Sequence, residues 1–177
     1  VPKLKKRVEQ LTVGDPRKGN MITPLIDEKA ADFAQSLIDD ALKLGATLVT
    51  GNRREKNLLY PTLLDQVTPE MKVAWIEPFA PVLPVLRVKD LDDAIALANQ
   101  SEYGLQSSVF TNDVNNAFYV ANRLEVGTVQ INNKTERGPD HFPFLGVKAS
   151  GMGTQGVKYS ILAMTRPKAI TLNLQEQ

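Results

Sequence analysis

The fold class is decided by residues 82–131, which read VLPVLRVKDLDDAIALANQSEYGLQSSVFTNDVNNAFYVANRLEVGTVQI. Short apolar runs alternate here with longer segments in which apolar residues recur at helical spacing. Asp90 stands directly before one of these segments, where a helix N-cap belongs. We predict strand, helix, strand, helix and strand over residues 82–88, 91–98, 107–110, 113–124 and 127–131. This alternation is typical of a parallel layer, so we predict an α/β protein with a three-layer, mostly parallel sheet.

The residues before this stretch add elements of the same kind. We predict a short basic helix in the first 13 residues and the longest helix over residues 27–44. The apolar residues of the longer helix predict its buried face at Phe33, Leu37, Ile38, Ala41 and Leu42. Strands are predicted near 46–50 and 58–67, and the proline-rich residues 75–81 are predicted to form a loop.

The periodicity disappears after Ile131. Residues 132–156 contain five glycines and two prolines, and an irregular segment of this length in a compact protein is usually functional. A helix near 157–164 and a strand near 168–174 are predicted to complete the chain.

The composition excludes several classes of function. Lysine plus arginine number 21 and aspartate plus glutamate 20, so the net charge of +1 gives no general attraction to nucleic acid or membranes. With no cysteine and one histidine, these residues offer no disulfide, no cysteine nucleophile and no predicted metal site. No apolar run reaches the roughly 18 residues of a membrane helix, and Val1 does not begin a recognisable signal peptide.

Two features of the glycine-rich segment have a chemical interpretation that their surroundings do not support. Gly151–Gly156 (GMGTQG) matches the dinucleotide-binding pattern G-x-G-x-x-G, but the residues before it lack the pattern of a buried strand. His141 follows Asp140, yet adjacent residues rarely form an orienting pair, and no companion nucleophile is marked. We therefore assign no catalytic residue.

Two charged residues are better candidates for binding. Glu77 lies in a stiff, proline-containing loop, where a carboxylate can accept two hydrogen bonds from a vicinal diol such as a ribose. Arg137 lies in the glycine-rich segment, where a guanidinium can bind phosphate or carboxylate through two parallel hydrogen bonds. For both residues, an ordinary solvated side chain is the alternative.

Several loops together carry the motifs of a known family. The chain resembles the C-terminal half of the aldehyde dehydrogenase catalytic domain in residues 77–82 (EPFAPV), Asn99, 103–105 (YGL), 109–111 (VFT), 131–140 (INNKTERGPD), 142–146 (FPFLG), Lys148, 150–151 (SG) and 155–156 (QG). The resemblance covers essentially the whole chain. Its longest motif, residues 131–140, is similar to the branch of the family that oxidises glyceraldehyde 3-phosphate to 3-phosphoglycerate with NADP.

The resemblance implies roles for four side chains. In the family, the acid that matches Glu77 binds the hydroxyls of the nicotinamide ribose, and the aromatic residue that matches Phe79 packs beside the nicotinamide. The arginine that matches Arg137 helps to hold the substrate phosphate, and the residue that matches Phe144 lines the substrate tunnel. Ala80 stands where the family usually has glycine, which bears on how Glu77 is presented.

The resemblance also implies an architecture. Residues 1–166 would form part of a catalytic domain, with 132–156 as its active-site loop region, and residues 167–177 would form an oligomerisation strand. The implied enzyme is a cytoplasmic homotetramer of glycolysis, without nucleic-acid or membrane partners. In the family, the nucleophilic cysteine, the general-base glutamate and the dinucleotide-binding domain precede the segment that matches Val1. We therefore expect a fragment that is inactive alone, and NADP is implied by the resemblance only.

Two alternatives stay open. One is an aldehyde dehydrogenase for another aldehyde, such as a semialdehyde whose carboxylate Arg137 would bind. The other is a non-catalytic subunit that associates through its last strand, whose exposed edge would require a partner.

Overall fold

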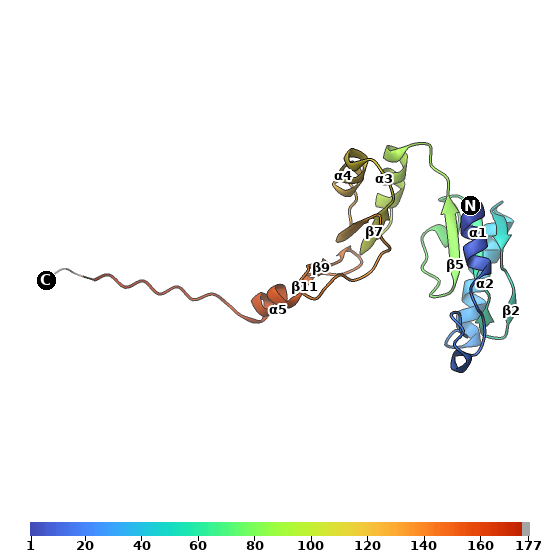
Figure 1. Cartoon of the computed structure of the whole chain (residues 1–177), viewed down its shortest axis with the longest axis horizontal. Helices are drawn as coiled ribbons and strands as arrows, with labels where there is room; N and C mark the ends of the chain where they lie inside the picture. Colours follow the sequence, from blue (N-terminus) through green and yellow to red (C-terminus); the bar gives the residue numbers. More distant parts are fainter. Residues whose placement is uncertain (175–177) are drawn as a thin grey trace. The chain divides into compact units, whose positions relative to one another are not determined.

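The computed structural model describes residues 1–174 in two compact units, which divide the chain at Val88 and Lys89. Both units combine helices with short strands, as Figure 1 shows, and this confirms the predicted α/β class. Within the described residues, no helix is both long enough and apolar enough to span a bilayer.

The first unit is built on a mixed sheet of three strands in the order β1–β4–β5. Strand β1 (Thr47–Thr50) is antiparallel to β4 (Thr62–Val67), which is parallel to β5 (Val82–Leu86). The Asp65 carboxylate of β4 accepts hydrogen bonds of 2.9 and 2.6 Å from Arg87, directly after β5. These bonds lower the pKa of Asp65 and join the two parallel strands by a bidentate ion pair.

Helix α2 (Glu28–Lys43) supplies the core of this unit. The Asp27 carboxylate caps its N-terminus by accepting a hydrogen bond of 2.7 Å from the Ala30 amide. The buried residues of the helix are Ala31, Ala34, Leu37, Ile38 and Ala41. Most of them pack against Leu59, Leu64, Val67, Met71 and Val73. The prediction that Phe33 belongs to this face is wrong: its side chain is 47% exposed, because the stripe of alanines one turn apart turns it away from the sheet.

The remaining elements of the first unit are short. Helix α1 (Pro2–Glu9) is shorter than the predicted basic helix and has no buried residue. The Thr50 hydroxyl donates a hydrogen bond of 3.1 Å to the Glu9 carboxylate, which fastens the end of α1 to β1. A 3₁₀ turn η1 (Pro16–Lys18), the hairpin β2 (Arg54–Glu55) and β3 (Leu58–Leu59), and a second 3₁₀ turn η2 (Lys72–Ala74) complete the unit.

The second unit contains the parallel arrangement predicted for residues 107–131. Strands β7 (Gln106–Val109) and β8 (Thr128–Ile131) are parallel, and helix α4 (Val114–Ala121) lies between them in the chain. Helix α3 (Leu91–Asn99) precedes β7 and begins after Asp90, which caps it as predicted. Strand β5, the first strand of the predicted series, lies in the first unit, where it pairs in parallel with β4.

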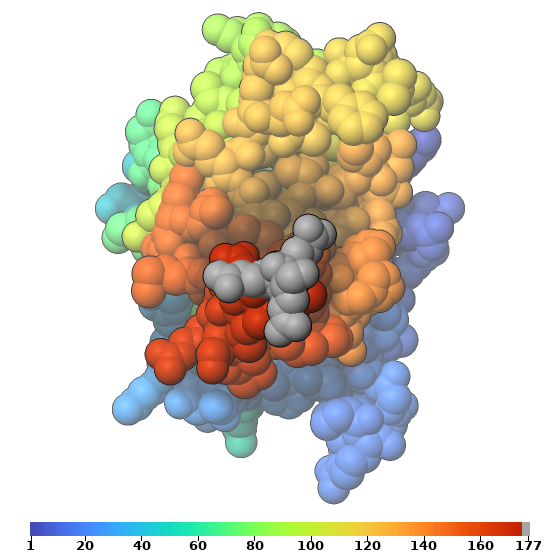
Figure 2. Space-filling view, turned by 90° about the vertical axis from the view of Figure 1, so that its left-hand side faces the viewer, coloured from blue at the N-terminus to red at the C-terminus, as the bar shows by residue number. Residues whose placement is uncertain are grey.

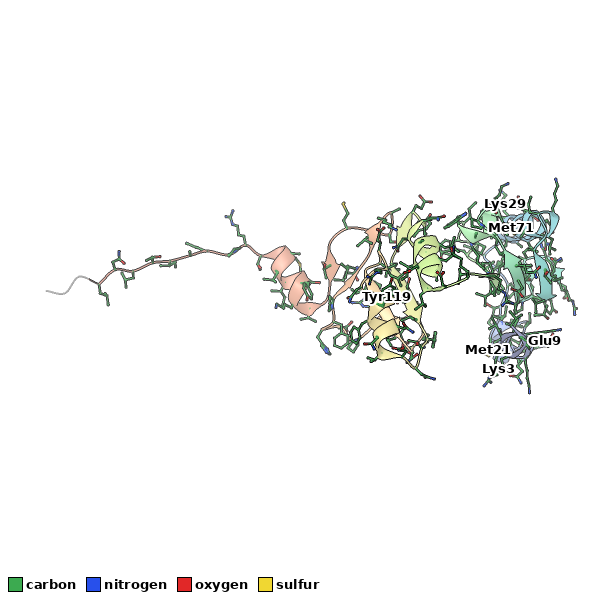
Figure 3. All side chains as sticks on the ribbon, turned by 90° about the horizontal axis from the view of Figure 1, so that it is seen from above. Lys3, Glu9, Met21, Lys29, Met71 and Tyr119 are labelled. Carbon is green, nitrogen blue, oxygen red and sulfur yellow. The ribbon has the colours of Figure 1, made fainter. Side chains whose placement is uncertain are left out.

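Helices α3 and α4 are joined by polar side chains. Tyr119, labelled in Figure 3, donates a hydrogen bond from its hydroxyl to Asp92 in the first turn of α3. This bond raises the pKa of the Tyr119 hydroxyl, since the neutral phenol is the hydrogen-bond donor. The Arg123 guanidinium lies 3.7 Å from the centre of the Tyr119 ring and covers its other side.

The C-terminal part of the second unit is irregular, as predicted, and ends in a helix. Strand β10 (Val147–Lys148) pairs with β6 (Tyr103–Gly104), and β11 (Thr154–Gln155) pairs with β9 (Phe144–Leu145). Helix α5 (Val157–Met164) matches its predicted bounds.

The predicted strand at 168–174 is not formed by the single chain. Residues 165–174 have no regular structure, and Ile170, Leu172 and Leu174 are exposed at alternating positions. Figure 1 shows the red residues of this segment as an extended stretch beyond α5, and Figure 2 views that stretch end-on. The last three residues of the predicted segment 167–177 lie outside the described residues.

The two sides of α2 allow a matched test of the core. We expect Ile38→Ala to lower the free energy of unfolding by about 2–5 kcal/mol, because Ile38 is fully buried and its truncation leaves a cavity. We expect Phe33→Ala on the exposed side to change it by less than about 0.5 kcal/mol. Urea unfolding of both variants, followed by circular dichroism, checks the difference, and equal losses would contradict this assignment of faces.

Candidate functional site

The predicted cofactor-binding residues lie in the loop between η2 and β5. The ends of this loop are fixed by backbone hydrogen bonds: the Ile76 amide donates to Lys72 at 2.9 Å, and the Thr62 amide donates to Pro81 at 2.8 Å. Glu77 and Phe79 are both exposed between these anchors. The loop therefore presents a carboxylate and an aromatic ring to solvent from a braced backbone.

The structure shows how this loop accommodates Ala80. Phe79 adopts a positive φ of 46°, whereas Ala80 does not enter the left-handed region. The Ala80 methyl packs at the edge of the core of the first unit, and its carbonyl accepts a hydrogen bond of 2.8 Å from Val82. The alanine thus causes no strain of its own, because the residue that makes the tight turn is Phe79.

The predicted substrate-binding residues lie together in the second unit. The Arg137 guanidinium carbon is 5.6 Å from the centre of the Phe144 ring, within the range of a cation–π contact. A pocket of about 420 Å³ opens beside Arg137 and is lined by Arg137, Asp140, Gln155, Gly156, Val157 and Ser160. The structure therefore brings together two residues that are seven positions apart in the sequence, and one of them, Arg137, lines a cavity.

The charges around Arg137 are distributed between two ion pairs. Its sequence neighbour Glu136 pairs with Lys134, with 2.9 Å between the Nζ and Oε2 atoms. The hydrogen bond from Lys134 lowers the pKa of the Glu136 carboxyl, which keeps this acid ionised and engaged. Arg137 instead lies 3.4 Å from Asp140, measured from Nη2 to Oδ1. The guanidinium thus has a long contact with Asp140 at the pocket in addition to its contact with the Phe144 ring.

The backbone of the glycine-rich segment is held in place by Lys148. Its ammonium donates hydrogen bonds of 2.7 and 3.2 Å to the carbonyl oxygens of Asn99 and Ser101 and contacts the Glu125 carboxylate at 3.0 Å. The resemblance includes Lys148 but assigns it no role. Hydrophobic periodicity could not have revealed this function, since it depends on contacts with residues that are 23 to 49 positions away in the sequence.

The glycines of this unit allow close backbone approach. A Cβ atom on Gly127 would lie 1.8 Å from the Leu145 carbonyl oxygen, so only glycine fits between β8 and β9. Gly156, with a φ of 126°, is the N-cap of α5 and leaves that helix without a side-chain cap. The Gly151–Gly156 run therefore forms turns and the antiparallel strand β11, which supports the view that it is not a cofactor fingerprint.

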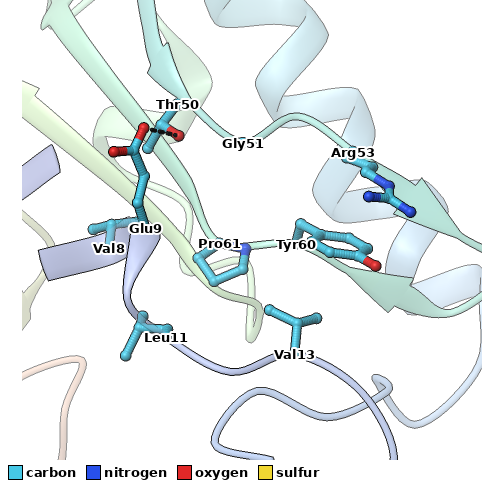
Figure 4. Close-up of a pocket in the computed structure, with 9 residues that line it drawn as sticks. All are labelled: Val8, Glu9, Leu11, Val13, Thr50, Gly51, Arg53, Tyr60 and Pro61. Atoms are coloured by element: carbon cyan, nitrogen blue, oxygen red, sulfur yellow. Dashed lines mark hydrogen bonds between the residues drawn. The ribbon is translucent and has the colours of Figure 1, made fainter. Parts of the chain in front are cut away.

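The other chemical features of the described residues do not coincide with the predicted site. The His141 ring packs edge-on against Phe142, with 4.7 Å between ring centres. A separate pocket of about 450 Å³ in the first unit, shown in Figure 4, is bordered by Glu9 and Thr50 on one side and by Arg53 and Tyr60 on the other. No group of three or more potential metal ligands occurs within residues 1–174.

The four predicted site residues thus fall into two groups. Glu77 and Phe79 lie in the first unit, and Arg137 and Phe144 lie in the second. Glu77, Phe79 and Arg137 are exposed on irregular chain, whereas Phe144 is half-buried in strand β9.

Comparisons with known proteins agree on one family. The model of the aldehyde dehydrogenase family matches residues 1–170. Over 98% of its length the chain is 56% identical to the NADP-dependent glyceraldehyde-3-phosphate dehydrogenase of Streptococcus equinus, of which it spans 37%.

Solved structures show the same relationship. The NADP complex of NADP-dependent glyceraldehyde-3-phosphate dehydrogenase from Bacillus halodurans C-125 matches with a TM-score of 0.92 and 64% identity, over 97% of this chain and 36% of that one. The succinate-semialdehyde dehydrogenase of Burkholderia pseudomallei matches with a TM-score of 0.85 and 38% identity, over 90% and 34%. The chain thus spans little more than a third of these relatives, and it belongs to the aldehyde dehydrogenase family.

Proposed function

We propose that this chain is part of an enzyme that oxidises glyceraldehyde 3-phosphate to 3-phosphoglycerate with NADP. The observation that carries the proposal is the 56% identity to a relative named for that substrate and cofactor, which extends over nearly the whole chain. The position of Arg137 on the rim of a pocket adds a physical reason, since a guanidinium suits the phosphate of such a substrate.

The residues of the chain fit the binding part of this reaction. Within the described residues, Glu77 makes no hydrogen bond or ion pair, so both its carboxylate oxygens are available to the two hydroxyls of a ribose. NADP, when bound, would accept the hydride of the aldehyde. Phe79 would flank the nicotinamide, Arg137 would hold the phosphate, and Phe144 would limit how far the guanidinium can move.

The bond-forming step requires residues that this chain does not have. Aldehyde oxidation through a covalent intermediate needs a nucleophile such as a thiolate, and the 177 residues contain no cysteine. We therefore propose that the chain orients cofactor and substrate while other residues of the complete polypeptide perform the chemistry, so that the chain alone is inactive.

The proposed architecture follows from the same comparison. We propose that residues 1–166 are part of a catalytic domain with a three-layer, mostly parallel sheet, to which the pairs β4–β5 and β7–β8 contribute. Residues 167–177 would then be the oligomerisation strand. The exposed, alternating Ile170, Leu172 and Leu174 support this role, since every second residue of a strand faces the same side.

A second substrate has specific support. The similarity to a succinate-semialdehyde dehydrogenase is also extensive, and a guanidinium binds a carboxylate as well as a phosphate. The position of Arg137 is therefore compatible with a semialdehyde, and the two substrates must be separated by experiment.

Arg137→Ala in the complete polypeptide separates them. We expect the KM for glyceraldehyde 3-phosphate to rise about 10- to 100-fold, in line with the loss of a hydrogen bond to a charged group. The KM for unphosphorylated glyceraldehyde should stay unchanged. Steady-state assays with NADP measure both constants, and Arg123→Ala, whose guanidinium lies on Tyr119, is the matched control. A larger effect on succinate semialdehyde than on the phosphorylated aldehyde would favour the second substrate.

The cofactor role of Glu77 predicts a different pattern. Glu77→Gln in the complete polypeptide should raise the KM for NADP and leave the KM for the aldehyde unchanged, because an amide replaces one of the two oxygens that accept from the ribose. Glu70→Gln, another exposed acid of the first unit, should change neither constant. An unchanged KM for NADP in the Glu77 variant would remove this residue from the cofactor site.

The C-terminal strand predicts association of the chain. We expect the double variant Ile170→Glu, Leu172→Glu to sediment as a monomer at concentrations where the unmodified chain forms oligomers, since two charges would stand on the apolar side of the strand. The variant Thr171→Glu, Asn173→Glu carries the same charges on the opposite side and should still associate. Sedimentation velocity distinguishes them, and a monomeric unmodified chain would argue against an oligomerisation strand.

A further inference from the structure

The pocket beside Arg137 has a second charged residue in its lining. Asp140 is three residues after Arg137 in the sequence, and its Oδ1 atom lies 3.4 Å from the Arg137 Nη2 atom. Both side chains line the same cavity of about 420 Å³, together with Gln155 and Ser160. A negative charge therefore occupies the place from which an anionic ligand would approach the guanidinium.

The backbone of Asp140 is fixed while its side chain is free. The Asp140 carbonyl accepts a hydrogen bond of 2.9 Å from the Val157 amide at the start of α5. A second bond of 2.8 Å closes the adjacent turn, from the Phe142 amide to the Pro139 carbonyl. The Asp140 side chain is nevertheless 82% exposed. These contacts keep the carboxylate at the mouth of the pocket but do not prevent it from rotating away.

The ion pair is weak enough to be displaced. Its distance of 3.4 Å exceeds the roughly 2.7–2.9 Å of a charge-assisted hydrogen bond. Exposed pairs of this kind contribute little to stability, since water and salt screen them. A phosphate, which carries more charge than a carboxylate and offers three acceptor oxygens, can therefore replace Asp140 at the guanidinium.

We infer that Asp140 competes with the anionic group of the ligand for Arg137 and thereby weakens the binding of that group. This inference rests on the proposed function, in which Arg137 binds the substrate phosphate. It adds that the affinity for the anion is set by two residues with opposite effects. Removal of the guanidinium abolishes binding, whereas removal of the aspartate charge strengthens it.

A phosphate titration of the 177-residue chain tests this inference without requiring turnover. Inorganic phosphate is added to the ¹⁵N-labelled chain, and the Nε–Hε signal of Arg137 is followed by NMR. We expect Asp140→Asn to lower the Kd for phosphate about two- to fivefold, the range that an exposed ion pair typically contributes. Glu102→Gln removes one negative charge from an exposed position outside the pocket and should leave the Kd unchanged.

The outcomes separate the inference from the proposed function. In the double variant Arg137→Ala, Asp140→Asn, phosphate should cause no saturable shift of the neighbouring amides, because the aspartate acts only through the arginine. If the unmodified chain and Asp140→Asn bind phosphate equally, or if the variant binds it more weakly, the competition by Asp140 is refuted while Arg137 keeps its role. If phosphate leaves the Arg137 signal of the unmodified chain unchanged, the competition by Asp140 and the proposed phosphate-binding role of Arg137 are both refuted.

Discussion

The contacts of the Lys148 ammonium with Asn99, Ser101 and Glu125 fasten the glycine-rich segment to the rest of the second unit. The glycine-rich segment has few buried residues of its own, so it cannot be held by apolar packing. The Lys148 side chain is 23% exposed, and its ammonium donates hydrogen bonds to two carbonyl oxygens and forms an ion pair with one carboxylate. One of these carbonyls, that of Asn99, is at the C-terminus of α3, where the helix dipole also favours a cation. Arg137 and Phe144 are positioned because the chain that carries them is fastened here.

In both units, contacts near the candidate site residues anchor the segment that carries them, although the contacts differ. In the first unit, the loop with Glu77 is anchored by backbone hydrogen bonds to η2 at one end and to β4 of the sheet at the other. The core packing ends where the loop begins, and only Ala80 of the loop contributes to it. A binding residue requires a rigid scaffold, which fixes its position, and an exposed loop, which lets a ligand reach it.

The fold was predictable where one face of an element is buried. Helix α2, which buries one face, lies within one residue of its predicted bounds, and Asp90 caps α3 as its position indicated. The failures arise where the pattern has two solutions. Phe33 is large and apolar, yet the small residues of α2 define the buried face because they allow the helix to approach the sheet closely. Strand β5 could pair with either neighbour, since periodicity identifies a strand but not its partner.

The candidate site was predictable as a set of residue types but not as an electrostatic arrangement. Motifs indicated Arg137, and its chemistry alone suggested an anion. Glu136, the adjacent acid, pairs with Lys134, and Asp140 is therefore the acid beside the guanidinium. This arrangement depends on the directions of side chains in an irregular loop. The distinction matters because the two acids have different consequences. An acid engaged by its own lysine is neutralised and leaves the arginine available, whereas an acid at the mouth of the pocket opposes every anion that enters. The arrangement of charges, more than their number, therefore decides what this loop can bind.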